Sequence, residues 1–134
     1  MTDIRFYHLT TTDLESALPR LLEKTLSRDW RAVVAAGSDE RVEALAAHLW
    51  TYDERGFLPH GSPKDGHAER QPVWLSTDDT NVNGAQVLFL IDGRGTERTA
   101  AYQVVAEVFD GGDPAAVQAA RRHWKAYTAA GHTP

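Results

Sequence analysis

The chain has 134 residues, a formal charge of −5 and no cysteine, which fits a single domain over residues 1–134 and excludes disulfides, thiol catalysis and thiolate metal sites. Hydrophobic residues make up 42% of the chain and charged residues 25%, which is typical of a globular protein. The sequence has no apolar run of membrane length and no secretory signal, so we expect a cytoplasmic protein without membrane contact. The acidic balance disfavours wide contact with nucleic acid.

The first half of the chain predicts strands and helices in alternation. Residues 4–9 alternate in polarity and predict a strand. Leucines and alanines at helical spacing from Leu14 to Leu26 predict a helix, opened by a capping box of Thr12 and Glu15, in which Pro19 marks either a kink or the first turn. The apolar run 32–36 predicts a buried strand, and Ser38 can cap the helix that follows.

The second half continues this alternation after an irregular segment, residues 50–71, that is rich in glycine and proline. Three further strands are predicted over 72–75, 86–91 and 102–109, with the second of them central. Asp113 and Pro114 predict the start of a last helix over about 115–129, which ends at Gly131. The fold class is therefore α/β: a sandwich with a mostly parallel central sheet.

Several kinds of chemistry lack support in the sequence. The turn at 36–40 carries one glycine and two carboxylates, which is the wrong charge for a phosphate, and no Walker motif occurs. The six histidines form no metal-binding pattern, although His60 and His67 allow a weak site to be imagined. No nucleophile elbow positions a serine. We therefore expect no catalytic residues, no metal and no cofactor.

Two features favour binding of protein segments. The first is the group of large apolar side chains at the end of the second helix, including Trp50 and Phe57, which either anchor a partner or cover the end of the core. The second is the last helix, where spacings of three and four residues place Arg121, Trp124 and Lys125 side by side. Two cations beside an aromatic ring suit an anionic group attached to an apolar one, such as a hydrophobic peptide C-terminus. A solvated basic face and a nucleic-acid contact are the alternatives.

The charge distribution agrees with the second feature. Residues 114–134 hold three basic residues and no acidic ones and carry +3, whereas the first 113 residues hold 11 basic and 19 acidic residues and carry −8. An acidic body with a basic end indicates a specific anionic partner at that end.

At these same positions the sequence resembles a known family, the chi subunit of bacterial DNA polymerase III. The matching segments are Leu-Trp…Phe-Leu-Pro-His over 49–60, the approach to the third strand over 67–75, and the last strand, turn and helix over 109–132. The opening Ile-Arg-Phe-Tyr over 4–7 also fits.

The resemblance implies a Rossmann-like three-layer α/β sandwich, and it implies a non-catalytic accessory subunit of the clamp-loader assembly in DNA replication. Such a subunit links the polymerase complex to the single-stranded-DNA-binding protein by holding that protein's acidic C-terminal tail, which ends in Asp-Ile-Pro-Phe. By similarity, the tail site maps onto Phe109, Arg121, Trp124 and Lys125. The psi subunit or a helicase-like protein maps onto Trp50 and Phe57.

One position departs from the family pattern. Val117 stands where members of the family can carry a basic residue, so the tail site is either weaker here or recruits Arg122 instead. The leading prediction is the accessory subunit, which reaches DNA only indirectly. The alternative is a nucleotide- or nucleic-acid-binding Rossmann-like module.

Overall fold

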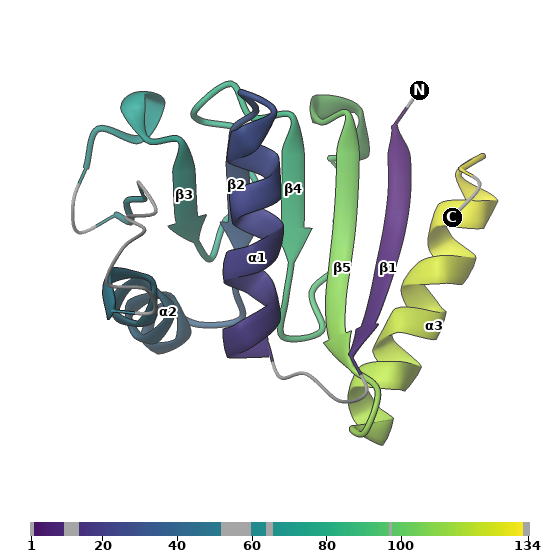
Figure 1. Ribbon diagram of the computed structural model, residues 1–134. Coiled ribbons are helices and arrows are strands. Elements are labelled where there is room, and N and C mark those ends of the chain that lie inside the picture. The colour runs from purple at the N-terminus through teal and green to yellow at the C-terminus, as the bar shows by residue number, and fades with distance from the viewer. Residues whose placement is uncertain (1, 10–13, 52–59, 64–65, 97, 133–134) are drawn as a thin grey trace.

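The computed structural model of the protein describes residues 2–9, 14–51, 60–63, 66–96 and 98–132, without the side chains of residues 50 and 51. Strands and helices alternate along these residues, as Figure 1 shows. In chain order the elements are β1 (Asp3–Leu9), α1 (Leu14–Ser27), β2 (Ala32–Ala35), α2 (Asp39–Thr51), η1 (Ala68–Arg70), β3 (Val73–Ser76), β4 (Val87–Leu90), η2 (Thr99–Ala101), β5 (Val104–Asp110) and α3 (Pro114–Ala129).

The five strands form one sheet in the order β1-β5-β4-β2-β3, and each pair of neighbours is parallel. The predicted α/β fold with a parallel sheet and a central fourth strand is thereby confirmed. The order places the first and last strands side by side along their whole length, with His8 opposite Phe109. The carboxyl ends of all five strands point to the lower edge of the sheet in Figure 1.

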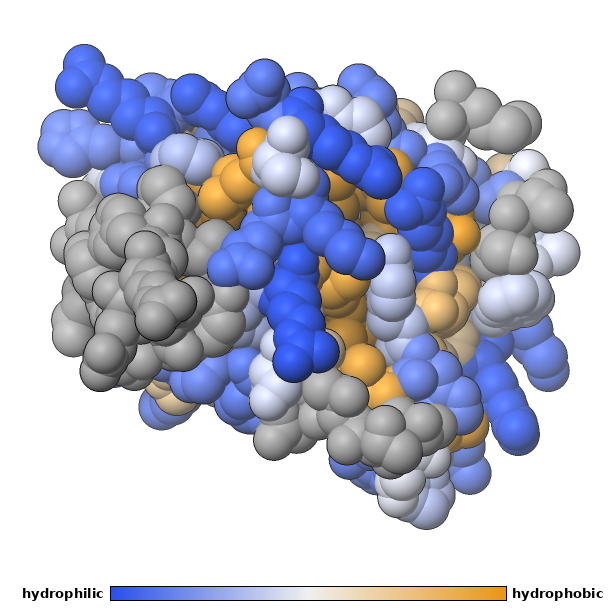
Figure 2. All heavy atoms as spheres, viewed as in Figure 1, coloured by the Kyte–Doolittle hydropathy of each residue, from blue (hydrophilic) through white to orange (hydrophobic). Residues whose placement is uncertain are grey.

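Helices cover both faces of the sheet, which gives the three layers. The face under α1 and α2 buries Leu18 and Leu22 from α1 and Leu45 and Leu49 from α2 against alternate strand residues. The opposite face packs against α3 through Tyr127. In Figure 2 the α1 side is mostly hydrophilic, with apolar side chains visible only between polar ones. Because β2 to β4 are covered on both faces, their residues are all buried, as the apolar runs predicted.

Pro19 lies inside α1, in the second turn, rather than at the start of the helix. A proline in this place cannot donate the backbone hydrogen bond to the carbonyl four residues earlier, which belongs to Glu15. Nε2 of His48, from α2, donates to that carbonyl oxygen at 2.6 Å. The neighbouring helix thus satisfies the acceptor that proline leaves open, and α1 continues to Ser27. Thr12, the predicted cap, lies outside the described residues.

The remaining elements follow their predicted ranges closely. Ser38 Oγ accepts the N–H of Arg41 at 3.2 Å, which is a cap on α2. The last strand begins two residues later than predicted, at Val104, because the chain first makes the short helix η2. None of the described helices combines the length and the apolar character needed to cross a bilayer.

Candidate functional site

The last helix is delimited at both ends by the residues that the sequence singled out. Asp113 Oδ1 accepts the N–H of Ala115 at 3.0 Å, and Pro114 occupies the first turn, where no intrahelical donor is needed. At the other end Gly131 adopts a φ of +96°, and the N–H of His132 donates to the carbonyl of Tyr127 at 2.9 Å. This pattern closes a helix with a left-handed residue that glycine adopts easily. The side chains of α3 are therefore placed by local sequence.

A groove of about 520 Å³ lies between α3 and the ends of β1 and β5. It contains all four residues predicted for the tail site. Its lining consists of rings, small apolar side chains and cations, namely Phe6, His8, Phe109, Val117, Ala120, Arg121, Trp124 and Lys125. We call it the α3 groove. The structure thus brings the predicted residues together on one surface, and it adds Phe6 and His8 from β1.

Aromatic rings form the apolar part of the α3 groove. The ring of Phe6 lies 5.2 Å from that of Trp124 and 6.5 Å from that of Phe109, measured between centroids. His8 stacks on Phe109 at 5.1 Å with an interplanar angle of 11°. Trp124 remains 46% exposed, which is high for so large an apolar side chain. Exposed aromatic surface next to a groove is the usual material of a binding site for an apolar group.

Two cations complete the α3 groove. Arg121 and Lys125 are both exposed and lie one helical turn apart. Within the described part of the chain, no carboxylate forms a salt bridge with either of them. Both side chains line the α3 groove. A guanidinium can hold a carboxylate through two parallel hydrogen bonds, which a single ammonium cannot do.

A buried polar pair fixes α3 to the sheet behind the α3 groove. Nδ1 of His123 lies 2.7 Å from Oε1 of Glu107, whose side chain is almost fully buried. Burial raises the pKa of Glu107, and the hydrogen bond from His123 works against that rise. Desolvation likewise raises the pKa of the Tyr127 hydroxyl well above its ordinary value. The sequence offers no sign that His123 and Glu107 form a pair, because they come from different elements.

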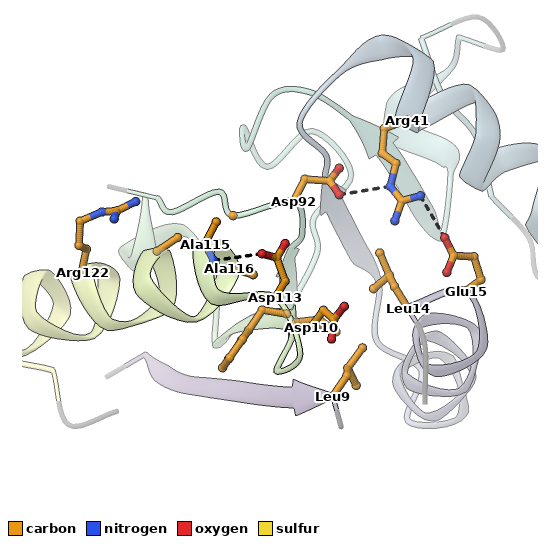
Figure 3. A pocket seen from close by; sticks show the side chains of 14 residues that line it. Leu9, Leu14, Glu15, Arg41, Asp92, Asp110, Asp113, Ala115, Ala116 and Arg122 are labelled. Atoms are coloured by element: carbon orange, nitrogen blue, oxygen red, sulfur yellow. Dashed lines mark hydrogen bonds and ion pairs between the residues drawn. The ribbon is translucent and has the colours of Figure 1, made fainter. Parts of the chain in front are cut away.

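A second and larger cavity, of about 720 Å³, opens at the carboxyl ends of the strands (Figure 3). Parallel α/β sheets often bind ligands there. In this protein four carboxylates and two arginines line it, namely Glu15, Asp92, Asp110, Asp113, Arg41 and Arg122.

The electrostatics of this strand-end cavity oppose a phosphate. Figure 3 shows the guanidinium of Arg41 between two carboxylates, with Glu15 at 3.0 Å and Asp92 at 3.2 Å. The second oxygen of Asp92 accepts the N–H of Gly37 at 3.0 Å, so the first turn after β2 is already occupied by a carboxylate of the protein itself. The charge of the cavity therefore agrees with the sequence argument against nucleotide binding.

The two histidines considered for a metal site, His60 and His67, have different structural roles. His60 is buried, and its Nε2 lies 3.1 Å from the carbonyl of Ala46, which makes it part of the core. His67 opens η1 in a left-handed conformation. Among the described residues no group of three or more potential metal ligands gathers at one place.

Two similarities to known proteins identify the family of this chain. The chain matches the family model described as DNA polymerase III chi subunit, HolC, over residues 1–134. It belongs to the DNA polymerase III chi subunit family. The relative named "Probable DNA polymerase III subunit chi" from Rickettsia prowazekii (strain Madrid E) is 32% identical over 91 residues. The aligned segment covers 68% of this chain and 55% of that relative, so the match spans about half of the relative's length. The family resemblance read from the sequence is confirmed.

The departure of this chi-family chain at Val117 has a structural counterpart. Val117 lines the α3 groove, so an apolar side chain replaces a possible cation there. Arg122, the predicted substitute for a cation at position 117, lines the strand-end cavity instead of the α3 groove. Consecutive helical residues point about 100° apart, which explains why Arg121 and Arg122 serve different surfaces. The ionisable ring that β1 brings to the α3 groove is His8.

The second predicted surface of this chi-family chain lies largely outside the described residues. Phe57 is not among them, and of Trp50 only the backbone, near the end of α2, is described. Helix α2 packs toward β2 and β3, whereas α3 lies beside β1 and β5 at the other end of the sheet, as Figure 1 shows. The assignment of Trp50 and Phe57 to a partner subunit stays a prediction.

Proposed function

We propose that this chain is a non-catalytic accessory subunit of the bacterial DNA polymerase III complex, and that its α3 groove holds the acidic C-terminal tail of the single-stranded-DNA-binding protein. The observation that carries the proposal is the composition of the groove. Exposed rings and two cations without a carboxylate partner among the described residues lie together on one surface. A peptide that ends in a hydrophobic residue presents the matching pair of groups, a ring and a carboxylate.

Each chemical group of such a tail has matching side chains in the α3 groove. The terminal phenyl group contacts Trp124 and Phe109, whose exposed surface it removes from water. The terminal carboxylate pairs with Arg121, and aspartates further up the tail lie toward Lys125. The groove volume of about 520 Å³ falls within the range of ordinary ligand sites. We expect micromolar affinity, roughly −8 kcal/mol.

The charge of the remaining surface gives this adaptor its selectivity for protein over DNA. The first 113 residues carry −8, which repels a phosphate backbone, and only the last 21 residues are basic. A protein of this kind reaches DNA through the tail of another protein that already coats it. In this way the clamp loader is linked to single-stranded DNA without competing for the DNA itself.

The test is calorimetric titration of the full chain with a peptide that ends in Asp-Ile-Pro-Phe. The same peptide with an amidated C-terminus is the matched control, because it differs only in the terminal charge. We expect micromolar binding of the free acid and at least roughly tenfold weaker binding of the amide, since a charged hydrogen bond is lost. Equal binding of both peptides would contradict the proposed role of Arg121. No binding of either peptide would overturn the proposed function.

A second proposal concerns the other end of the molecule. We propose that the psi subunit or a helicase-like protein binds at Trp50 and Phe57. It is supported by the family resemblance and by the placement of α2 and α3 at opposite ends of the sheet. A partner at the end of α2 and a tail peptide in the α3 groove would not compete for one surface. The alternative function, a nucleotide- or nucleic-acid-binding module, requires binding of single-stranded DNA or nucleotide in the absence of any tail peptide, and fluorescence titration measures this directly.

A further inference from the structure

We propose that His8 acts as a third cation of the α3 groove, one that is charged only when protonated, so that binding of a peptide carboxylate takes up a proton at this imidazole. The inference rests on the proposed function of the α3 groove. It adds a specificity-determining residue from β1 and a dependence on pH that the two cations of α3 alone do not produce.

The first observation is the position of the imidazole. His8 is exposed and lines the α3 groove, and its ring stacks on Phe109 with centroids 5.1 Å apart and an interplanar angle of 11°. The parallel register of β1 and β5 places the two residues directly opposite each other. The stack leaves the ring edge, with its nitrogen atoms, as the polar part of the side chain. His8 thus presents an ionisable group beside the rings that would hold the end of a peptide.

The second observation is the space kept for this ring by the turn after β5. The N–H of Gly111 donates to the carbonyl of Leu9 at 2.7 Å, which holds the turn against the end of β1. A Cβ atom at Gly111 would overlap the imidazole of His8. Any side chain at this position would therefore displace the ring from Phe109. The backbone of the turn and the ring of Phe109 together define where the imidazole lies.

The third observation is the charge that surrounds His8. From α3, Arg121 and Lys125 share its groove. The carboxylate of Asp110 accepts the N–H of Gly112 at 2.8 Å and lines the strand-end cavity instead. The carboxylate of Glu107 is buried against His123. Among the described residues, therefore, no salt bridge joins a carboxylate to His8.

Binding and protonation then support each other. Like charges disfavour the charged form of an imidazole, and an opposite charge favours it. A carboxylate that binds between Arg121 and His8 attracts the protonated imidazole, so the complex holds more protons than the free protein. By linkage, affinity must then rise as the pH falls through the range in which histidine changes its charge. At an exposed site, the gain amounts to about two- to fivefold in affinity.

The experiment measures proton uptake directly. The peptide that ends in Asp-Ile-Pro-Phe is titrated into the full chain by calorimetry at about pH 5.5 and about pH 8, on either side of the histidine range. Near neutral pH, the titration is repeated in two buffers with different ionisation enthalpies, since the difference in observed heat gives the number of protons taken up. For the natural chain we expect uptake of a fraction of a proton and tighter binding at the lower pH.

Three variants isolate His8. His8→Phe keeps a ring on Phe109 without a titratable group, and we expect it to bind the peptide with no proton uptake and no gain at low pH. His8→Lys carries a permanent charge, and we expect it to bind equally well at both pH values. His132→Gln removes a histidine at the end of α3 that does not line the groove, and we expect it to behave like the natural chain.

The outcomes separate this inference from the proposed function. Peptide binding without proton uptake in the natural chain, or unchanged uptake in His8→Phe, overturns the role of His8 and leaves the proposed function intact. The second of these results would assign the proton to another group, such as His123. Failure of the peptide to bind at either pH overturns both proposals.

Discussion

Phe6 and Trp124 lie at opposite ends of the sequence, yet their ring centroids are 5.2 Å apart in the α3 groove. One ring comes from the edge strand β1 and the other from the last helix. The contact exists because the edge strand β1 pairs with β5, the strand that leads into α3. A single pair of side chains thus joins the first and last elements of the chain and forms the apolar part of the α3 groove.

Replacement of Arg121 tests the carboxylate contact. Arg121→Ala should weaken binding of the tail peptide by about 1.5–3 kcal/mol, because a hydrogen bond between two charged groups is lost. Arg122→Ala is the matched control, since it removes the same charge from the same helix but from the side that faces the strand-end cavity. Isothermal titration of both variants provides the measurement. Equal losses in the two variants would show that only the overall charge of α3 matters.

Replacement of Trp124 tests the apolar part of the α3 groove. Trp124→Ala should cost about 2 kcal/mol in peptide affinity, as expected for a central aromatic anchor. Because the side chain is 46% exposed, the free energy of unfolding should change by no more than about 1 kcal/mol. Trp124→Phe should retain most of the affinity. Titration and denaturant unfolding, measured on the same samples, separate the two effects, and a large loss of stability would assign Trp124 to the core instead.

The buried carboxyl group of Glu107 predicts a dependence of stability on pH. Burial raises its pKa in the folded protein above the ordinary value of 4.5. At pH values between the ordinary pKa and the raised pKa of Glu107, the folded state binds more protons than the unfolded state. This group therefore makes the stability of the fold fall as the pH rises through that interval. Glu107→Gln should therefore raise the melting temperature near neutral pH, and the difference should vanish well below pH 4.5.

Thermal unfolding as a function of pH provides that measurement. Glu69→Gln, which removes an exposed carboxylate, controls for the loss of one negative charge. A melting temperature of Glu107→Gln below that of the natural chain at neutral pH would mean that the pair with His123 outweighs the cost of burial.

Replacement of Trp50 tests whether the two proposed surfaces are separate. Trp50→Ala should abolish or strongly weaken binding of the partner subunit, by about 2 kcal/mol or more if the ring is a central anchor. Affinity for the tail peptide should change by less than about 0.5 kcal/mol, since distant sites act independently. A pull-down with the partner and a peptide titration measure the two effects. Loss of peptide binding in this variant would indicate that the surfaces are coupled.

Much of the site could be predicted from the sequence because it depends on one helix. The spacing of Arg121, Trp124 and Lys125 places them on one face in any straight helix. Asp113 and Gly131 predict the two ends of that helix, because capping depends on residues that are close in the sequence. The contributions of β1 were missed. The period of two residues in the first strand does place Phe6 and His8 on one face, but it does not say which strand or helix that face meets.

The sequence by itself determined the order of the main strands and helices, the α/β class and the chemistry of the face of α3. These features depend on interactions between residues a few positions apart, which hydrophobic periodicity and capping residues record. Only the tertiary structure decided that β1 lies beside β5 and that His8 stacks on Phe109. Strand order depends on the packing of whole faces far apart in the chain, and no local pattern encodes that choice.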